Sequence, residues 1–161
     1  MLKQSRSLVD AIKQAQFNLH TMSAVNHHVI AEHTIHAWCM DMTASVLQQD
    51  LDAHMQLVST NIKVYGIPEN GVIDYAGWKT RRKYEFTNKE LLVLNYRNIR
   101  LITSTQRRLT FNVTETMVGK DGKMVILDKN IVLEKEMDGQ WRVVEENINK
   151  WQVKKINLAN L

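Results

Sequence analysis

From Leu109 to Val153 the sequence reads LTFNVTETMVGKDGKMVILDKNIVLEKEMDGQWRVVEENINKWQV. Apolar and β-branched residues alternate here with polar ones, which is typical of strands in a sheet. Two Asp-Gly steps, Asp121-Gly122 and Asp138-Gly139, separate the runs, and Asp-Gly favours the two-residue turn of a β-hairpin. Together with the apolar residues that begin at Leu91, this stretch predicts a four-strand antiparallel meander.

The first third of the chain has the opposite character. Residues 7–58 contain no Gly and no Pro, and their apolar residues recur at helical spacing. Asn26 and Asp50 are residue types that cap helices, so they divide the segment into an N-terminal helix, a second helix ending near Gln49 and a short third helix.

Between these two parts, residues 61–65 predict a strand that stops at the Gly66-Ile67-Pro68 turn. Asp74 then caps a helix over 75–86 that has one apolar edge and one charged edge. The order of elements predicts an α+β fold in which the N-terminal helices pack on a strongly curved antiparallel sheet.

Composition limits the class of protein. The 161 residues suit one domain, and the net charge of +4 is a mild basic bias without any zinc-finger, homeodomain or RNP pattern, so we expect no nucleic-acid partner. Cys39 is the single cysteine, which excludes an internal disulfide. No signal-peptide pattern and no run of eighteen apolar residues is present, which predicts a cytoplasmic protein without a membrane partner.

Two-residue turns at both Asp-Gly steps would place Glu115 opposite Asp128, and Asn130 opposite Asn147. With that register both faces of the sheet are apolar, and the helices of one chain can cover only one of them. We therefore expect a homodimer that buries the second face.

The sequence resembles the nuclear transport factor 2-like superfamily, which includes SnoaL-like proteins and ketosteroid isomerases. The resemblance spans Ile35 to Val153 and rests on the helical start, the strand NIKVYG with its turn, the helix after Asp74 and the hairpin MDGQWRVVEE. It implies one cystatin-like, cone-shaped domain over 1–161, with residues 1–25 as an extra N-terminal helix. It also implies a pocket at the open end of the cone for a small, mostly apolar molecule.

In ketosteroid isomerases the catalytic base would fall where this chain has Gly66 and Ile67, and the oxyanion donor would fall near Ile131. Neither position carries a carboxylate. Because proton transfer next to a carbonyl needs both groups, the resemblance does not imply steroid isomerisation.

Three carboxylates are candidate catalytic groups: Asp41, Glu115 and Asp128. Asp41 shares a helix stripe with Trp38 and could be a desolvated general base, although an Asp on a helix surface is common. Glu115 and Asp128, if they face each other in a pocket, would repel and could share a proton as an acid/base pair. The alternative is a hydrogen-bonded polar network at an interface.

The candidate ligand-binding residues are mainly aromatic or amide-bearing: Trp38, Met42, Tyr65, Trp78, Arg82, Asn130 and Asn147. An aromatic rim beside Arg81 or Arg82 would suit a planar organic acid, so the expected ligand is a small organic molecule, mostly apolar or anionic.

We expect no metal and no cofactor. His28, Glu32 and His36 share a helix face, but they extend over two turns, too far for one ion on a straight helix.

These patterns leave two classes of function. The first is a small-molecule-binding domain, a class that includes cofactor-free lyases, isomerases and hydrolases that use a pocket carboxylate. The second is a non-catalytic, dimeric interaction module whose cone is filled by its own side chains. An open cavity with an ionisable group at its base distinguishes the first from the second.

Overall fold

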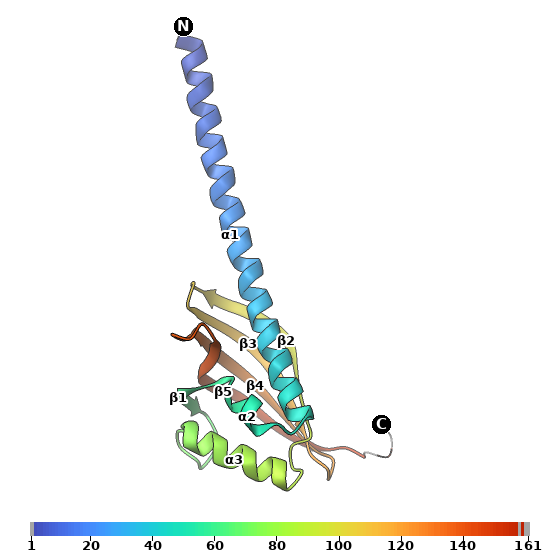
Figure 1. Ribbon diagram of the computed structural model, residues 1–161. Helices are drawn as coiled ribbons and strands as arrows, with labels where there is room; N and C mark the ends of the chain where they lie inside the picture. The colour runs from blue at the N-terminus through green and yellow to red at the C-terminus, as the bar shows by residue number, and fades with distance from the viewer. Residues whose placement is uncertain (1, 158, 160–161) are drawn as a thin grey trace.

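The computed structural model describes residues 2–157 and residue 159, with side chains from residue 7 onward; residues 1, 158, 160 and 161 of the expected domain lie outside this description. Figure 1 shows one long helix standing on a domain made of a curved sheet and two shorter helices. The elements are, in order, α1 (Leu2–Leu47), α2 (Leu51–Met55), β1 (Val58–Tyr65), α3 (Tyr75–Thr87), β2 (Val93–Ser104), β3 (Arg108–Val118), β4 (Lys123–Lys135) and β5 (Trp141–Lys155).

The division of the N-terminal region at Asn26 is wrong. Residues 2–47 form one uninterrupted α-helix of 46 residues. A capping residue ends a helix only where the backbone also leaves the helical conformation, and no Gly or Pro at this point forces it to do so. The N-terminal helix and the first domain helix are therefore one rigid element.

The two other predicted caps are confirmed. The Asp50 side chain accepts a hydrogen bond from the Ala53 N–H at the start of α2, and Asp74 accepts one from the Gly77 N–H at the start of α3. In both helices a carboxylate satisfies an N–H group that has no partner within the helix.

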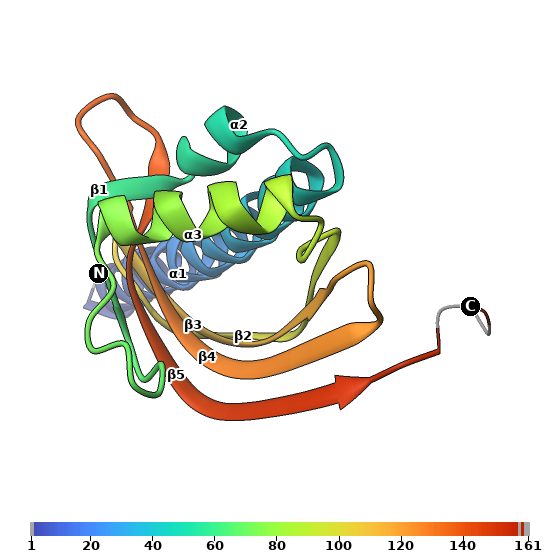
Figure 2. The same ribbon diagram turned by 90° about the horizontal axis from the view of Figure 1, so that it is seen from below.

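The predicted α+β class with helices on a curved sheet is confirmed. The sheet has the strand order β1-β5-β4-β3-β2, and β2 to β5 form the expected antiparallel meander. The sheet is mixed, however, because β1 runs parallel to β5. Seen from below, the sheet curls around one side of the domain while α2 and α3 lie across the opening (Figure 2).

The expected two-residue turns are three-residue loops. The Gly119 N–H donates to the Lys123 carbonyl, and the Glu136 N–H donates to the Gln140 carbonyl. The last loop residue is a glycine with positive φ in each case, +79° at Gly122 and +83° at Gly139. A type I turn followed by a left-handed glycine is the usual three-residue hairpin loop.

The additional loop residue changes the register of β3 against β4. Glu115 pairs with Leu127, and Asp128 pairs with Thr114, so the expected Glu115 and Asp128 pair is wrong. The expected Asn130 and Asn147 pair is confirmed, because an irregularity between Val132 and Leu133 compensates for the longer loop between β4 and β5.

This register also alters the two faces of the sheet. The concave face carries the apolar core positions of β3 and β4, and the outer face is largely polar, with Thr110, Asn112, Thr114, Thr116, Asp128 and Asn130 among its residues. The expectation that both faces are apolar is wrong. The predicted register of β3 against β4 differs by one residue from the observed one, so it assigned alternate residues to the wrong face. The sheet-to-sheet homodimer was predicted in order to bury a second apolar face, and that reason no longer holds.

The hydrophobic core lies between the concave face and the C-terminal half of α1. Ile35, Phe111, Ile131 and Leu133 are fully buried there. Among the residues that the structure describes, no helix is both long enough and apolar enough to cross a membrane.

Candidate functional site

A cavity of about 390 Å³ opens between α3, the turn after β1 and the concave face of β3, β4 and β5. Most of its wall is apolar, including Val64, Ile73, Leu127, Ile148 and Trp151. The core closes one end of the cone, and this cavity occupies the other end. The structure thus has an open cavity of the size that small organic ligands occupy.

Nine charged residues also line the cavity, and three of them are buried side chains of the concave face. Lys129 Nζ lies 3.0 Å from Glu115 Oε1, and 3.0 and 3.1 Å from the two carboxylate oxygens of Glu146. All three residues are buried, with exposed fractions of 1% for Glu115 and Glu146 and 4% for Lys129. We call this group the Glu-Lys-Glu cluster.

The strands determine this arrangement. Glu115, Lys129 and Glu146 lie on β3, β4 and β5, which are neighbours in the sheet, and all three face the cavity. One ammonium group lies between two carboxylates, so the cluster carries one more negative than positive charge when all three groups are ionised. Buried Arg82 is a further positive charge that acts on Glu146. A buried ionic cluster at the wall of a cavity is a candidate functional site.

The charges of the cluster and its burial favour a proton on Glu146. Burial raises the pKa of Glu146, the Lys129 ammonium opposes this rise, and the Glu115 carboxylate adds to it. Burial alone would lower the pKa of Lys129, but Glu115 and Glu146 outweigh it and raise that pKa, so Lys129 stays protonated. Glu115 Oε1 is near Lys129 but accepts no well-aligned hydrogen bond within the described part of the chain. This oxygen can therefore accept a proton or a hydrogen bond from a ligand.

The wall opposite the cluster is formed by α3. The Arg82 guanidinium donates to both oxygens of Glu85 at 3.2 and 3.1 Å and lies over the Trp78 ring, 5.5 Å from its centroid. Arg81 also donates to Glu85, at 3.1 Å. Glu85 balances only one of the two guanidinium charges, so these three residues together leave one net positive charge on this wall.

A buried histidine holds this wall in place. His54 Nε2 accepts hydrogen bonds from Trp78 Nε1 at 3.1 Å and from Arg82 Nε at 3.2 Å, and Nδ1 lies 2.9 Å from Ser45 Oγ. Since Ser45 Oγ donates to the Met42 carbonyl, the Nδ1–H of a neutral imidazole donates to Ser45. Burial, followed by the charges of Arg82 and Lys129, lowers the pKa of His54 to about 2.

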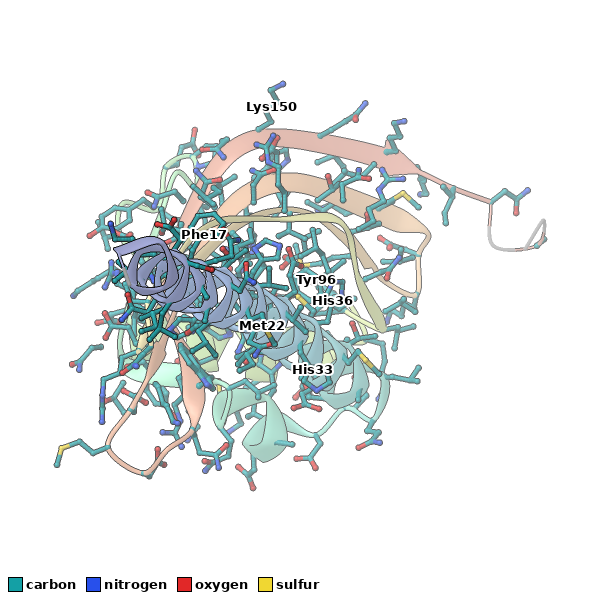
Figure 3. All side chains as sticks on the ribbon, turned by 90° about the horizontal axis from the view of Figure 1, so that it is seen from above. Phe17, Met22, His33, His36, Tyr96 and Lys150 are labelled. Atoms are coloured by element: carbon teal, nitrogen blue, oxygen red, sulfur yellow. The ribbon has the colours of Figure 1, made fainter. Side chains whose placement is uncertain are left out.

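The predicted site residues fall into three groups. Trp78, Arg82 and Glu115 line the cavity. Trp38 and Met42 are core residues: Trp38 packs against Tyr96 and Phe111 with ring centroids 6.0 and 6.2 Å apart, and Met42 is fully buried. Figure 3 shows Tyr96 beside the axis of α1.

The remaining five candidates lie elsewhere. Asp41 is exposed on α1, and Tyr65 is exposed at the end of β1. Asp128, Asn130 and Asn147 belong to the outer face of the sheet, where Asn112 Nδ2 donates to both Asp128 Oδ1 and Asn130 Oδ1. The polar network considered as the alternative therefore exists, but without Glu115.

Sequence reasoning missed His54, Lys129 and Glu146 as site residues. With two-residue turns, Lys129 and Glu146 would lie on the face opposite Glu115. The additional residue in the β3–β4 loop places all three residues on one face. With three-residue loops assumed, a lysine and a glutamate occupy core-facing positions of neighbouring strands. Charged residues at such positions would have indicated the site.

The histidines of α1 form no recognisable metal centre. Glu32 lies between two of them, with its oxygens 3.5 Å from His28 Nε2 and 3.8 Å from His36 Nε2, and all three side chains are partly or largely exposed. Among the described residues, no group of three or more His, Cys, Asp or Glu side chains is arranged to hold a metal ion.

Comparison with known proteins adds the fold but no activity. No protein-family model matches the sequence, and no curated protein matches it. Solved structures do match. A protein of Novosphingobium aromaticivorans, provisionally assigned as a scytalone dehydratase, aligns with a TM-score of 0.62 at 11% identity over 83% of this chain and 93% of that one.

Two further structures show the same architecture. A nuclear transport factor 2-like protein of unknown function from Shewanella oneidensis aligns with a TM-score of 0.60 at 17% identity, over 73% of this chain and 97% of that one. A type 2 hexachlorocyclohexane dehydrochlorinase aligns with a TM-score of 0.53 at 13% identity, over 80% of this chain and 91% of that one. This protein therefore has the nuclear transport factor 2-like fold, which is also described as cystatin-like.

Proposed function

We propose that this protein is a cofactor-free lyase or isomerase that removes a proton from carbon in a small, neutral and largely apolar organic molecule. One observation carries the proposal: the Glu-Lys-Glu cluster is buried at the wall of an open cavity of about 390 Å³ whose lining is apolar in its larger part. An interaction module with a filled cone would have no need for this open cavity or for buried charges along its wall.

The chemistry follows from the charges. Glu115 or Glu146 accepts the proton from the substrate carbon, and burial raises the pKa of Glu146, which makes that carboxylate a stronger base than it is in water. The electron pair of the broken C–H bond forms a double bond. In an isomerisation the same carboxylic acid returns the proton at another carbon, and in an elimination a leaving group departs with the electron pair of its own bond.

Lys129 has a supporting role. Because its pKa is raised, it keeps a positive charge beside the carboxylates while a proton is transferred. Negative charge that develops on a carbonyl or leaving-group oxygen of the substrate would be stabilised by this ammonium in a site of low polarity.

The sequence left two classes of ligand open, mostly apolar molecules and anionic molecules, and the charges of the cavity favour one of them. An anionic ligand would meet a cluster with excess negative charge and an Arg82 that is already paired with Glu85. A neutral molecule avoids this repulsion, so the mostly apolar alternative is favoured. The dehydrochlorinase and the assigned dehydratase of the same fold are named for elimination reactions, which supports the reaction class by analogy only.

Deuterium exchange tests the proposal with a defined probe, 2-tetralone, which is flat, neutral and largely apolar and has acidic C–H bonds beside its carbonyl. Incubated in D₂O, the wild-type protein should incorporate deuterium at these carbons faster than buffer alone, as followed by mass spectrometry. At least one of the variants Glu115→Gln and Glu146→Gln should slow this incorporation by at least about 100-fold, the usual effect of removing a general base, and that variant identifies the base.

The control is Asp128→Asn, because Asp128 lies on the outer face and should leave the exchange rate unchanged. Thermal unfolding of each variant verifies that it is folded. A wild-type rate equal to that of buffer, or an equal loss of rate in Asp128→Asn, would contradict the proposed function.

A further inference from the structure

The N-terminal half of α1 has no neighbour in the described chain. Every side chain from residue 7 to residue 30 is exposed, and Figure 1 shows this part of the helix extending well beyond the domain. Helices in proteins obtain most of their stability by packing an apolar face. A free helical segment of this length, with large apolar side chains on it, indicates that a partner is needed.

Six of the eleven large apolar side chains that are exposed on α1 follow a heptad pattern. Successive positions four and three residues apart form one stripe, which we call the α1 seam: Leu8, Ile12, Ala15, Leu19, Met22, Asn26, Val29, His33, His36 and Met40. The exposed fractions of its large apolar members are 64% for Leu8, 50% for Ile12, 66% for Leu19, 61% for Met22, 59% for Val29 and 71% for Met40. Spacing of 3.5 residues is the signature of a left-handed coiled coil.

The α1 seam points away from the domain. Where α1 contacts the core, its buried side is formed by Ala31, Ile35, Trp38 and Met42. At 100° per residue, His33, His36 and Met40 project from the opposite side of the helix. A second helix can therefore lie along this side without displacing core contacts.

The residues beside the α1 seam match a second copy of the same chain. The positions flanking it between residues 9 and 30 are uncharged: Val9, Ala11, Gln16, Asn18, Ser23, Val25 and Ile30. Two identical helices therefore meet there without repulsion between like charges, and no charge pattern selects a different partner.

The polar seam positions favour a parallel arrangement. In a parallel, in-register pair, Asn26 faces Asn26, and each amide can donate to the other's carbonyl; a single Asn at such a position typically fixes register in dimeric coiled coils. In the fully overlapping antiparallel pair, Asn26 would face Met22, and His36 would face Ile12. Those contacts would bury polar groups against apolar ones.

From this pattern we propose that α1 of two copies forms a parallel two-stranded coiled coil through the α1 seam. The core-facing side of α1 then points away from the shared seam in each copy. This assembly differs from the sheet-to-sheet dimer and does not depend on the function proposed above.

Two pairs of variants test the proposal, each with a control at Phe17, which is 65% exposed but lies off the α1 seam. Figure 3, viewed along α1, has Phe17 and Met22 on different sides of the helix. Leu19→Lys should raise the dimer dissociation constant by more than about 100-fold in sedimentation equilibrium, because two lysines replace two buried leucines. Phe17→Lys should leave it within about threefold of the wild-type value.

Under mild oxidation, Ala15→Cys should give a covalent dimer on a non-reducing gel, and Phe17→Cys should not. The native Cys39 does not compete, because it is 3% exposed and burial raises its pKa to about 12. A monomeric wild-type protein, a dimer that persists in Leu19→Lys, or a dimer in which Ala15→Cys fails to cross-link would each overturn the proposal. Circular dichroism confirms that every variant is folded.

Discussion

His54 shows how one buried side chain links the core to the cavity. It accepts hydrogen bonds from two residues of the cavity wall, Trp78 and Arg82, and its other nitrogen faces Ser45 on α1. A protonated imidazole could not accept these hydrogen bonds, and it would lie beside the Arg82 guanidinium. The neutral form is therefore part of the folded structure.

This requirement predicts a pH dependence of stability. The pKa of His54 falls from 6.5 to about 2 on folding, so below pH 6.5 the unfolded chain binds a proton that the folded chain does not. The titration of His54 therefore leaves the free energy of unfolding unchanged above pH 6.5. Below pH 6.5 this free energy decreases as the pH falls, by up to about 1.4 kcal/mol per pH unit for one proton.

Urea unfolding of the wild type and of His54→Gln between pH 7.5 and 4.5 measures this effect. The glutamine amide can accept a hydrogen bond from Trp78 and donate one to Ser45, but it does not titrate. The unfolding free energy of the variant should therefore change less steeply with pH, by the contribution of about one proton. Identical slopes in the two proteins would show that His54 is not held neutral.

At the residue scale the sequence predicts the site incompletely, for a specific physical reason. Trp78 and Arg82 were found because they follow helical spacing, which a strong N-cap at Asp74 fixes. Glu115 was selected with the wrong partner, because strand faces alternate and one extra loop residue exchanges them. His54 carries no pattern at all, since its role depends on contacts with residues up to 28 positions away.

At the scale of elements, the turn after β1 determines how closely that strand end approaches β5. Gly66 has φ +91°, and a Cβ there would lie 2.5 Å from the Ile148 carbonyl oxygen. Ile148 lines the cavity, so this close contact also shapes the cavity wall.

Gly66→Ala should therefore destabilise the protein by at least about 2 kcal/mol more than Gly71→Ala does. Gly71 is a matched control, because its φ is +61° and its Cβ would meet nothing within 4 Å. Chemical denaturation gives both values. Equal destabilisation of the two variants would mean that only backbone strain matters at Gly66.

The elements themselves were largely predictable from sequence. Asp50 and Asp74 mark real helix starts, and the alternating runs mark real strands. Two features depended on information beyond local pattern. Asn26 resembled a cap but lies within a continuous helix, and β1 joins the sheet parallel to β5, a pairing between distant segments that no local signal specifies.

At the scale of the whole molecule, the fold separates two tasks. The cone presents a cavity with the Glu-Lys-Glu cluster, while the N-terminal half of α1 projects away from it (Figure 1). The same fold occurs in proteins of different assigned activities, so the chemistry must be argued from the cavity and not from the fold.

The most direct test of this account is a crystal structure of the protein grown with 2-tetralone. We expect the ketone in the cavity, with its carbonyl oxygen or an adjacent carbon within about 3.5 Å of Glu115, Lys129 or Glu146. A cavity closed by the Trp78 and Trp151 side chains, or a ketone bound only elsewhere, would contradict the assignment of this cavity as the functional site.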